Sequence, residues 1–214
     1  MQLHTAAAHA GRAGVSRTGA YSFSPQAPAR AASPFSRCSI LLAPGFQGAL
    51  ALDWRHRLPE FSTVRQAEWE IPDLDIWAQS ILKAARRLPQ PVVVVAQGFA
   101  CLATVRAAAL RPGVIAGALL TAPSDPVRLG FQERLADLTL DLPSVLVCNE
   151  GDQELPPERA WQWALHWNSQ FASLGQGGHA GAHSGHAGWQ RKPELGFDLL
   201  EQLCRRVAAP AEAA

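Results

Sequence analysis

Two kinds of hydrophobic pattern alternate along the chain from residue 38 onward. Short apolar runs predict strands at residues 38–43, 64–67, 92–96, 114–120, 144–148 and 170–174. Between these runs, apolar residues recur at helical spacing, which predicts helices at 74–88, 101–110, 157–167 and 194–207. The run Pro91-Val-Val-Val-Val-Ala96 has no polar face, as is typical of a strand covered on both sides. The alternation predicts an α/β protein with a doubly wound, mostly parallel sheet.

Two of the predicted helices carry recognisable start signals. Asp73 follows Pro72 and suits the N-cap of the 74–88 helix, and Pro157 suits the first turn of the 157–167 helix. Most tryptophans of that second helix are expected in the core, whereas one exposed tryptophan would mark a partner surface.

The first 36 residues have a different composition from the rest. They are rich in Ala, Ser, Gly and Pro, and residues 1–37 contain four arginines and no acidic residue. Such a segment cannot bury enough apolar surface to offset its ordering entropy. We predict a disordered tail at 1–36, a single domain at 37–209 and a C-terminal tail at 210–214. A mitochondrial targeting segment and an over-called start codon remain alternatives for the first segment.

Charge and cysteine content narrow the class of protein. The 214 residues include 19 basic and 18 acidic ones, so no strong net charge favours binding to a nucleic acid or to an anionic membrane. The apolar runs are shorter than the roughly 20 residues of a membrane-spanning helix. The four cysteines are widely spaced without a C-x-x-C pair, which predicts buried free thiols and a cytoplasmic location.

Chemistry is expected in the loops that follow the strands, because ligands of such sheets bind at the carboxyl ends of the strands. The loop after the first strand contains Gly45, Phe46, Gln47 and Gly48. Backbone N–H groups of this turn could face a bound oxygen. The alternative is that the glycines only permit a tight turn.

The loop after the third strand has the context of a nucleophile elbow. In the pattern G-x-S-x-G, a serine sits on a sharp turn between a strand and a helix. Small residues flank the turn here as Ala96 and Ala100, but the central residue is Gly98, which has no side chain. The nearest candidate replacement, Cys101, lies three residues further on, and we expect it to pack in the core.

Asp152 follows the fifth strand and His179 follows the sixth, in the chain order of an α/β-hydrolase triad. In that scheme His179 is the general base and Asp152 orients it. Asp152 alone could equally form a turn. His179, His183 and His186 could instead bind a metal on their Gly-rich loop, but we expect no native metal and no cofactor.

Several motifs in the right order resemble the small bacterial serine hydrolases related to retinoblastoma-binding protein nine. They include Leu-Ala-Pro-Gly45-Phe-Gln-Gly48, Pro72-Asp-Leu-Asp-Ile-Trp77, Gly178-His179 and Ser184-Gly-His186, within residues 40–203. The resemblance implies a compact, lidless α/β-hydrolase. Its triad aligns with Gly98, Asp152 and His179. We expect the N–H groups of Phe46 and Phe99 to act as the oxyanion donors.

The chain departs from this family at the elbow itself. The usual His-Ser-Leu-Gly is replaced by Gln97-Gly98-Phe99-Ala100, which deletes the atom that forms the acyl-enzyme. We therefore expect a protein of an ester or acyl hydrolase family whose activity is lost or much weakened. The alternative is a non-catalytic module that binds a small acyl or ester ligand, or a protein, at the same place. Nucleic acid and membrane partners are not expected.

Overall fold

The predicted sheet is present in the computed structural model, which describes residues 33–48, 53–66, 70–89, 91–152, 154–175 and 193–209. Six strands are ordered β2-β1-β3-β4-β5-β6, and every neighbouring pair is parallel. Their bounds are β1 Ser39–Ala43, β2 Ser62–Thr63, β3 Val92–Gly98, β4 Gly117–Pro123, β5 Ser144–Cys148 and β6 Gln170–Ser173. The predicted fold class is confirmed.

Helices connect most of the strands. The α-helices are α1 Leu74–Ala85, α2 Phe99–Leu110, α3 Gln132–Leu135, α4 Pro157–His166 and α6 Pro193–Ala208, and short 3-10 helices span Pro34–Arg37 (η1), Phe46–Gly48 (η2) and Asp53–Arg57 (η3). Asp73 caps α1 as predicted, because its Oδ1 accepts hydrogen bonds from the N–H groups of Asp75 and Ile76. Pro157 is the first residue of α4, also as predicted.

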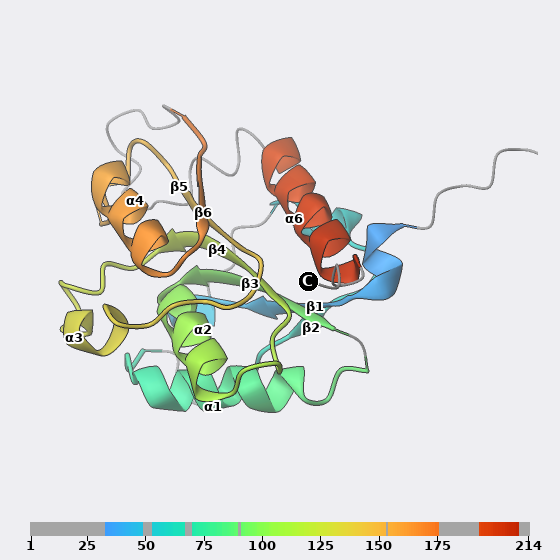
Figure 1. Cartoon of the computed structure of the whole chain (residues 1–214), viewed down its shortest axis with the longest axis horizontal. Coiled ribbons are helices and arrows are strands. Elements are labelled where there is room, and N and C mark those ends of the chain that lie inside the picture. Colours follow the sequence, from blue (N-terminus) through green and yellow to red (C-terminus); the bar gives the residue numbers. More distant parts are fainter. Residues whose placement is uncertain are drawn as a thin grey trace, which may run out of the picture. The chain divides into compact units, whose positions relative to one another are not determined.

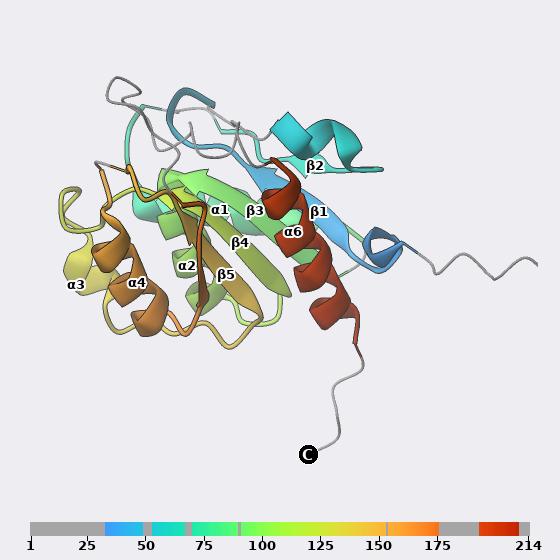
Figure 2. The ribbon, with the colours of Figure 1, turned by 90° about the horizontal axis from the view of Figure 1, so that it is seen from above.

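The sheet is covered on both faces, as Figures 1 and 2 show with α1 and α2 on one side and α6 on the other. Alternate residues of β3 explain why. Val92 and Val94 pack into the core formed with α1, α2 and α4, whereas Val93 and Val95 pack into the core formed with α6 and η1. A strand buried on both faces needs an unbroken apolar run, and the valines of β3 form such a run.

Two strands differ from their predicted bounds: β2 begins earlier in the chain and β4 begins later. β2 was expected at 64–67, but only Ser62 and Thr63 pair with β1, and Val64 is buried just after the strand. β4 was expected at 114–120 and instead spans Gly117–Pro123, because pairing with β3 and β5 begins after the turn that buries Ile115. Hydrophobicity located buried residues such as Val64 and Ile115, whereas backbone pairing decided which residues form the ladders.

The N-terminal boundary of the described structure also differs from the prediction. Residues 34–36, assigned to a structureless tail, belong to the 3-10 helix η1. Phe35 is buried, and its ring lies 5.4 Å from that of Phe197 on α6. The burial of Phe35 thus packs this short helix against a helix from the other end of the chain.

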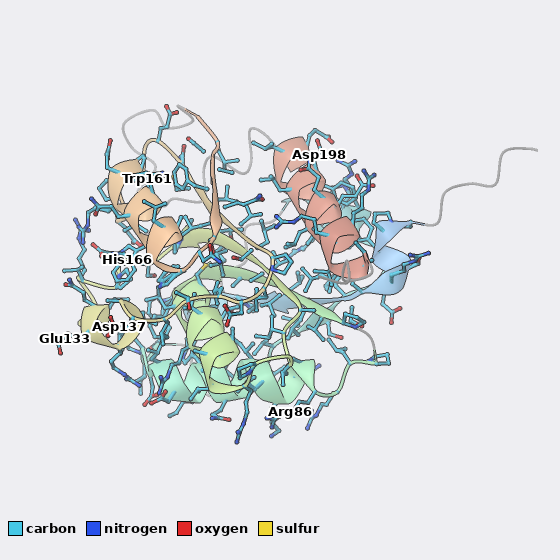
Figure 3. All side chains as sticks on the ribbon, in the orientation of Figure 1. Arg86, Glu133, Asp137, Trp161, His166 and Asp198 are labelled. Atoms are coloured by element: carbon cyan, nitrogen blue, oxygen red, sulfur yellow. The ribbon has the colours of Figure 1, made fainter. Side chains whose placement is uncertain are left out.

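The predicted environments of cysteine and tryptophan are confirmed. All four cysteines are free and buried. Trp163 on α4 and Trp167 at its C-cap are buried, whereas Trp161 is half exposed on the outer side of that helix (Figure 3). Within the described ranges, no helix has the length and apolar character needed to cross a membrane.

Candidate active site

The sheet brings the carboxyl ends of three strands together around Gly98. Ala43 at the end of β1 pairs with Ala96 of β3, and Pro123 at the end of β4 pairs with Gly98 itself. The loops that follow β1, β3 and β4 therefore meet at one edge of the sheet, as expected for a doubly wound fold.

Gly98 has the backbone conformation of a strained turn. It is the last residue of β3 and the N-cap of α2, with φ 59° and ψ −127°. An L side chain rarely adopts this conformation, whereas glycine does so readily. The arrangement of strand, sharp turn and helix is that of a nucleophile elbow, formed here by a residue without a nucleophile.

Space is available for a side chain at this turn. A Cβ atom placed on Gly98 would lie 3.7 Å from the Cα of Gly45 and 3.8 Å from the Oγ of Ser124, both ordinary van der Waals distances. Gly98 is also partly exposed, so solvent reaches it. The conformation, and not crowding, is what makes glycine favourable here.

An aromatic cluster fixes the position of the turn. Phe99, the first residue of α2, is fully buried; its ring stacks on Phe46 at 5.2 Å and meets the edge of Trp77 at 4.9 Å. Trp77 is anchored in turn by a hydrogen bond from its indole N–H to the carbonyl of Ile71. These interactions hold the loop after β1 against the start of α2.

The loop after β1 is a tight turn of the expected kind. Gln47 has a positive φ of 56°, and the N–H of Gly48 donates to the carbonyl of Gly45. Two residues tie this turn to the elbow: the backbone of Gly45 faces Gly98, and the ring of Phe46 stacks on Phe99. The glycines thus do form a tight turn, and this turn lies beside Gly98.

Cys101 packs in the core, as predicted. Its side chain is fully buried, and the carbonyl oxygens of Ala96 and Thr121, at 3.3 Å and 3.4 Å from Sγ, are the acceptors for its single S–H. Burial raises the pKa of the Cys101 thiol well above its ordinary value. A neutral, buried thiol is not suited to act as a nucleophile at this turn.

Asp152 lies in the loop after β5 and is largely buried. Its Oδ1 accepts hydrogen bonds from the N–H groups of Glu154 and Leu155, so the carboxylate does form the turn that the sequence allowed. His179, His183 and His186 lie outside the described residues. Elsewhere in the described ranges, no group of three or more His, Cys, Asp and Glu side chains is placed to hold a metal ion.

Sequence reasoning missed the polar pair that follows β4. Ser124 is buried beside the elbow, and Asp125 is buried in an ion pair, with its Oδ2 2.6 Å from Nη2 of Arg159 and 3.8 Å from Nε of Arg128. The sequence feature that could have identified them is their place: two polar residues directly after a buried strand, where ligands of such sheets bind.

The conformation of Gly98 leads to a prediction about stability. We expect Gly98→Ala and Gly98→Ser each to lower the free energy of unfolding by about 1–3 kcal/mol, because a Cβ is strained at this φ. The two costs should be similar, since the penalty comes from Cβ and not from the hydroxyl. Chemical denaturation of the three proteins measures them. Variants as stable as the parent would show that the turn is not strained.

Comparisons with known proteins find hydrolases. A sequence model described as serine hydrolase matches residues 40–201. No curated protein sequence matches the chain. Among solved structures, a protein described as a YdeN-like hydrolase from Pectobacterium atrosepticum is 26% identical, with a TM-score of 0.69 over 83% of this chain and 95% of that one.

More distant structures share the fold. A thermophilic esterase is 12% identical, with a TM-score of 0.60 over 79% of this chain and 90% of its own. Est1E from Butyrivibrio proteoclasticus, solved with ferulic acid bound, is 14% identical, with a TM-score of 0.58 over 78% of this chain and 90% of its own. At such identities the likeness concerns the fold alone.

Proposed function

The chain belongs to the serine hydrolase family, and from that premise we propose that it is an ester or acyl hydrolase by descent in which acyl transfer is lost or much weakened. The observation that carries the proposal is the backbone of Gly98. This residue stands at the turn between β3 and α2 with a positive φ, where the fold presents its nucleophile, and it has no side chain. Without a serine oxygen no acyl-enzyme can form there.

The remaining machinery is assigned by position. Asp152 corresponds to the triad acid and His179 to the general base, and the N–H groups of Phe46 and Phe99 are the proposed oxyanion donors. The first N–H groups of α2 have no partner within the helix, and no side chain caps them in the described structure, which supports Phe99 as a donor. Gly45 and Gln47 shape the turn that carries Phe46.

The finer resemblance is part of the same proposal. Within the serine hydrolases, we propose that the chain is related to the small lidless proteins that resemble retinoblastoma-binding protein nine, and the motifs around Gly45, Asp73 and His179 support this proposal. The free, buried cysteines support a reducing compartment, so we include a cytoplasmic location. The ligand we propose is a small acyl or ester compound, without a cofactor, metal, nucleic acid or membrane.

The second candidate function is a non-catalytic binding module that uses the same strand ends. It is favoured by the same glycine, because a protein selected only for binding keeps the more stable residue at a strained turn.

Ester hydrolysis distinguishes the two functions. If weak hydrolysis persists, the parent should hydrolyse a p-nitrophenyl ester above the buffer rate, and His179→Ala should remove that excess, because an oxyanion site and a base can still accelerate attack by water. His56→Ala, on the exposed η3 helix, is the matched control and should change nothing. If the parent is no faster than buffer, the binding module becomes the favoured function. A parent as fast as a normal serine esterase would contradict the proposal.

A further inference from the structure

A bulge in the sheet places Ser124 beside the position of the missing nucleophile. Gln97 pairs with Thr121, but Gly98 pairs with Pro123, so Ala122 is an extra residue on β4. Ala122 has a positive φ of 41°, which is unusual for a residue with a side chain. Such bulges re-aim the residues that follow, and strained residues of this kind cluster at functional sites.

The hydroxyl of Ser124 lacks a partner in the described part of the chain. Its side chain is 7% exposed, and its Oγ lies 3.8 Å from where the Cβ of residue 98 would be. No described residue makes a hydrogen bond with this hydroxyl, and its oxygen is not one of the fully buried side-chain atoms that lack a partner, so it keeps contact with solvent. The hydroxyl can therefore donate to a ligand at the position where the side chain of residue 98 would lie.

The neighbouring charges suit an anionic ligand. Gly98 is the N-cap of α2, a helix of 12 residues, whose unpaired N–H groups and dipole favour negative charge at this end. Asp125, next to Ser124, is already paired with Arg159 and Arg128, so its carboxylate is compensated. Hydrogen-bond donors thus approach the vacated position from two strand ends.

We propose that this position binds the carboxyl group of a free carboxylic acid, with one oxygen at the N–H of Phe99 and the other at the hydroxyl of Ser124. In an acyl-enzyme, the serine oxygen is one of the two oxygens on the acyl carbon. With glycine at position 98, a free acid can bring its own second oxygen to the same place. An ester would instead place an alkylated oxygen there, which is bulkier and a weaker acceptor for Ser124. The inference deepens the proposed function, on which it rests, by naming the acid product as the preferred ligand.

Calorimetric titration of the full chain tests the inference with two acid and ester pairs: hexanoate with methyl hexanoate, and phenylacetate with methyl phenylacetate. The parent should bind an acid at least about tenfold more tightly than its ester, since a hydrogen bond to a charged group typically changes affinity by that much. Ser124→Ala should weaken acid binding about tenfold, leave ester binding unchanged and so remove the preference. Ser80→Ala, a half-buried serine on α1, is the matched control and should keep the preference.

Three results would overturn the inference. They are equal affinity for acid and ester, an acid preference that survives Ser124→Ala, and no binding of either acid by the parent. The proposed function is judged independently by fluorophosphonate labelling of Gly98→Ser, which does not require the Ser124 hydroxyl. Labelling of Ser124 in the parent would overturn both, because Ser124 would then be a nucleophile.

Discussion

Gly98→Ser is expected to make the protein react with a fluorophosphonate probe that does not label the parent. The parent has no side chain at the elbow and should not be labelled, whereas the variant places a hydroxyl on the turn between β3 and α2. The space around Gly98 accepts the new side chain, since its Cβ meets neighbours only at ordinary van der Waals distances. Because removing such a serine costs about 10⁶ in turnover, we expect restoration to raise ester hydrolysis at least about 10²-fold. In-gel fluorescence and p-nitrophenyl ester assays measure the two effects.

Gly98→Ala is the control for this experiment, because it introduces the same strained Cβ without the hydroxyl. It should remain unlabelled and no faster than the parent. The double variant Gly98→Ser, His179→Ala should lose labelling if His179 is the base. A folded Gly98→Ser protein that stays inert would show that the base or the oxyanion turn is not in place. Stoichiometric labelling of any serine in the parent would contradict the loss of the nucleophile.

Arg159→Met is expected to destabilise the protein by about 2–4 kcal/mol. Arg159 Nη2 lies 2.6 Å from Oδ2 of Asp125, a carboxylate that is almost fully buried at the end of β4. Removing the cation leaves a buried charge with only the more distant Arg128 for compensation. The expected loss is below that of a fully buried pair because Arg159 is about one-third exposed. Urea denaturation measures the change in the free energy of unfolding.

Two further variants isolate the ion pair. Asp125→Asn combined with Arg159→Met should recover much of the loss, since Asn removes the charge and can still accept the hydrogen bond that Asp125 Oδ1 takes from the N–H of Val127. Arg205→Met breaks the exposed pair with Glu201 and should cost less than about 1 kcal/mol. If Arg159→Met costs no more than Arg205→Met, the pair does not stabilise the loop after β4.

The sequence by itself determined most of the fold, because the signals for strands, helices and turns lie in residues that are close together in the chain. The apolar run at β3 predicted a strand buried on both faces, and Asp73 and Pro157 predicted where α1 and α4 begin. The small residues around Gly98, between a strand pattern and a helix pattern, predicted the sharp turn now seen with its positive φ. Apolar spacing, helix capping and backbone freedom depend on residues close together in the chain, so the sequence pattern predicts them.

Only the tertiary structure decided which distant residues meet at that turn. The bulge at Ala122 is a matter of register between β3 and β4, and it is what sets Ser124 beside Gly98. The partner of Asp125 comes from α4, and the partner of Phe35 comes from α6. β2 shows the same limit, because pairing with β1, and not its own hydrophobicity, selects its two residues. Such interactions depend on strand register and helix packing, which bring together segments whose local patterns carry no information about each other.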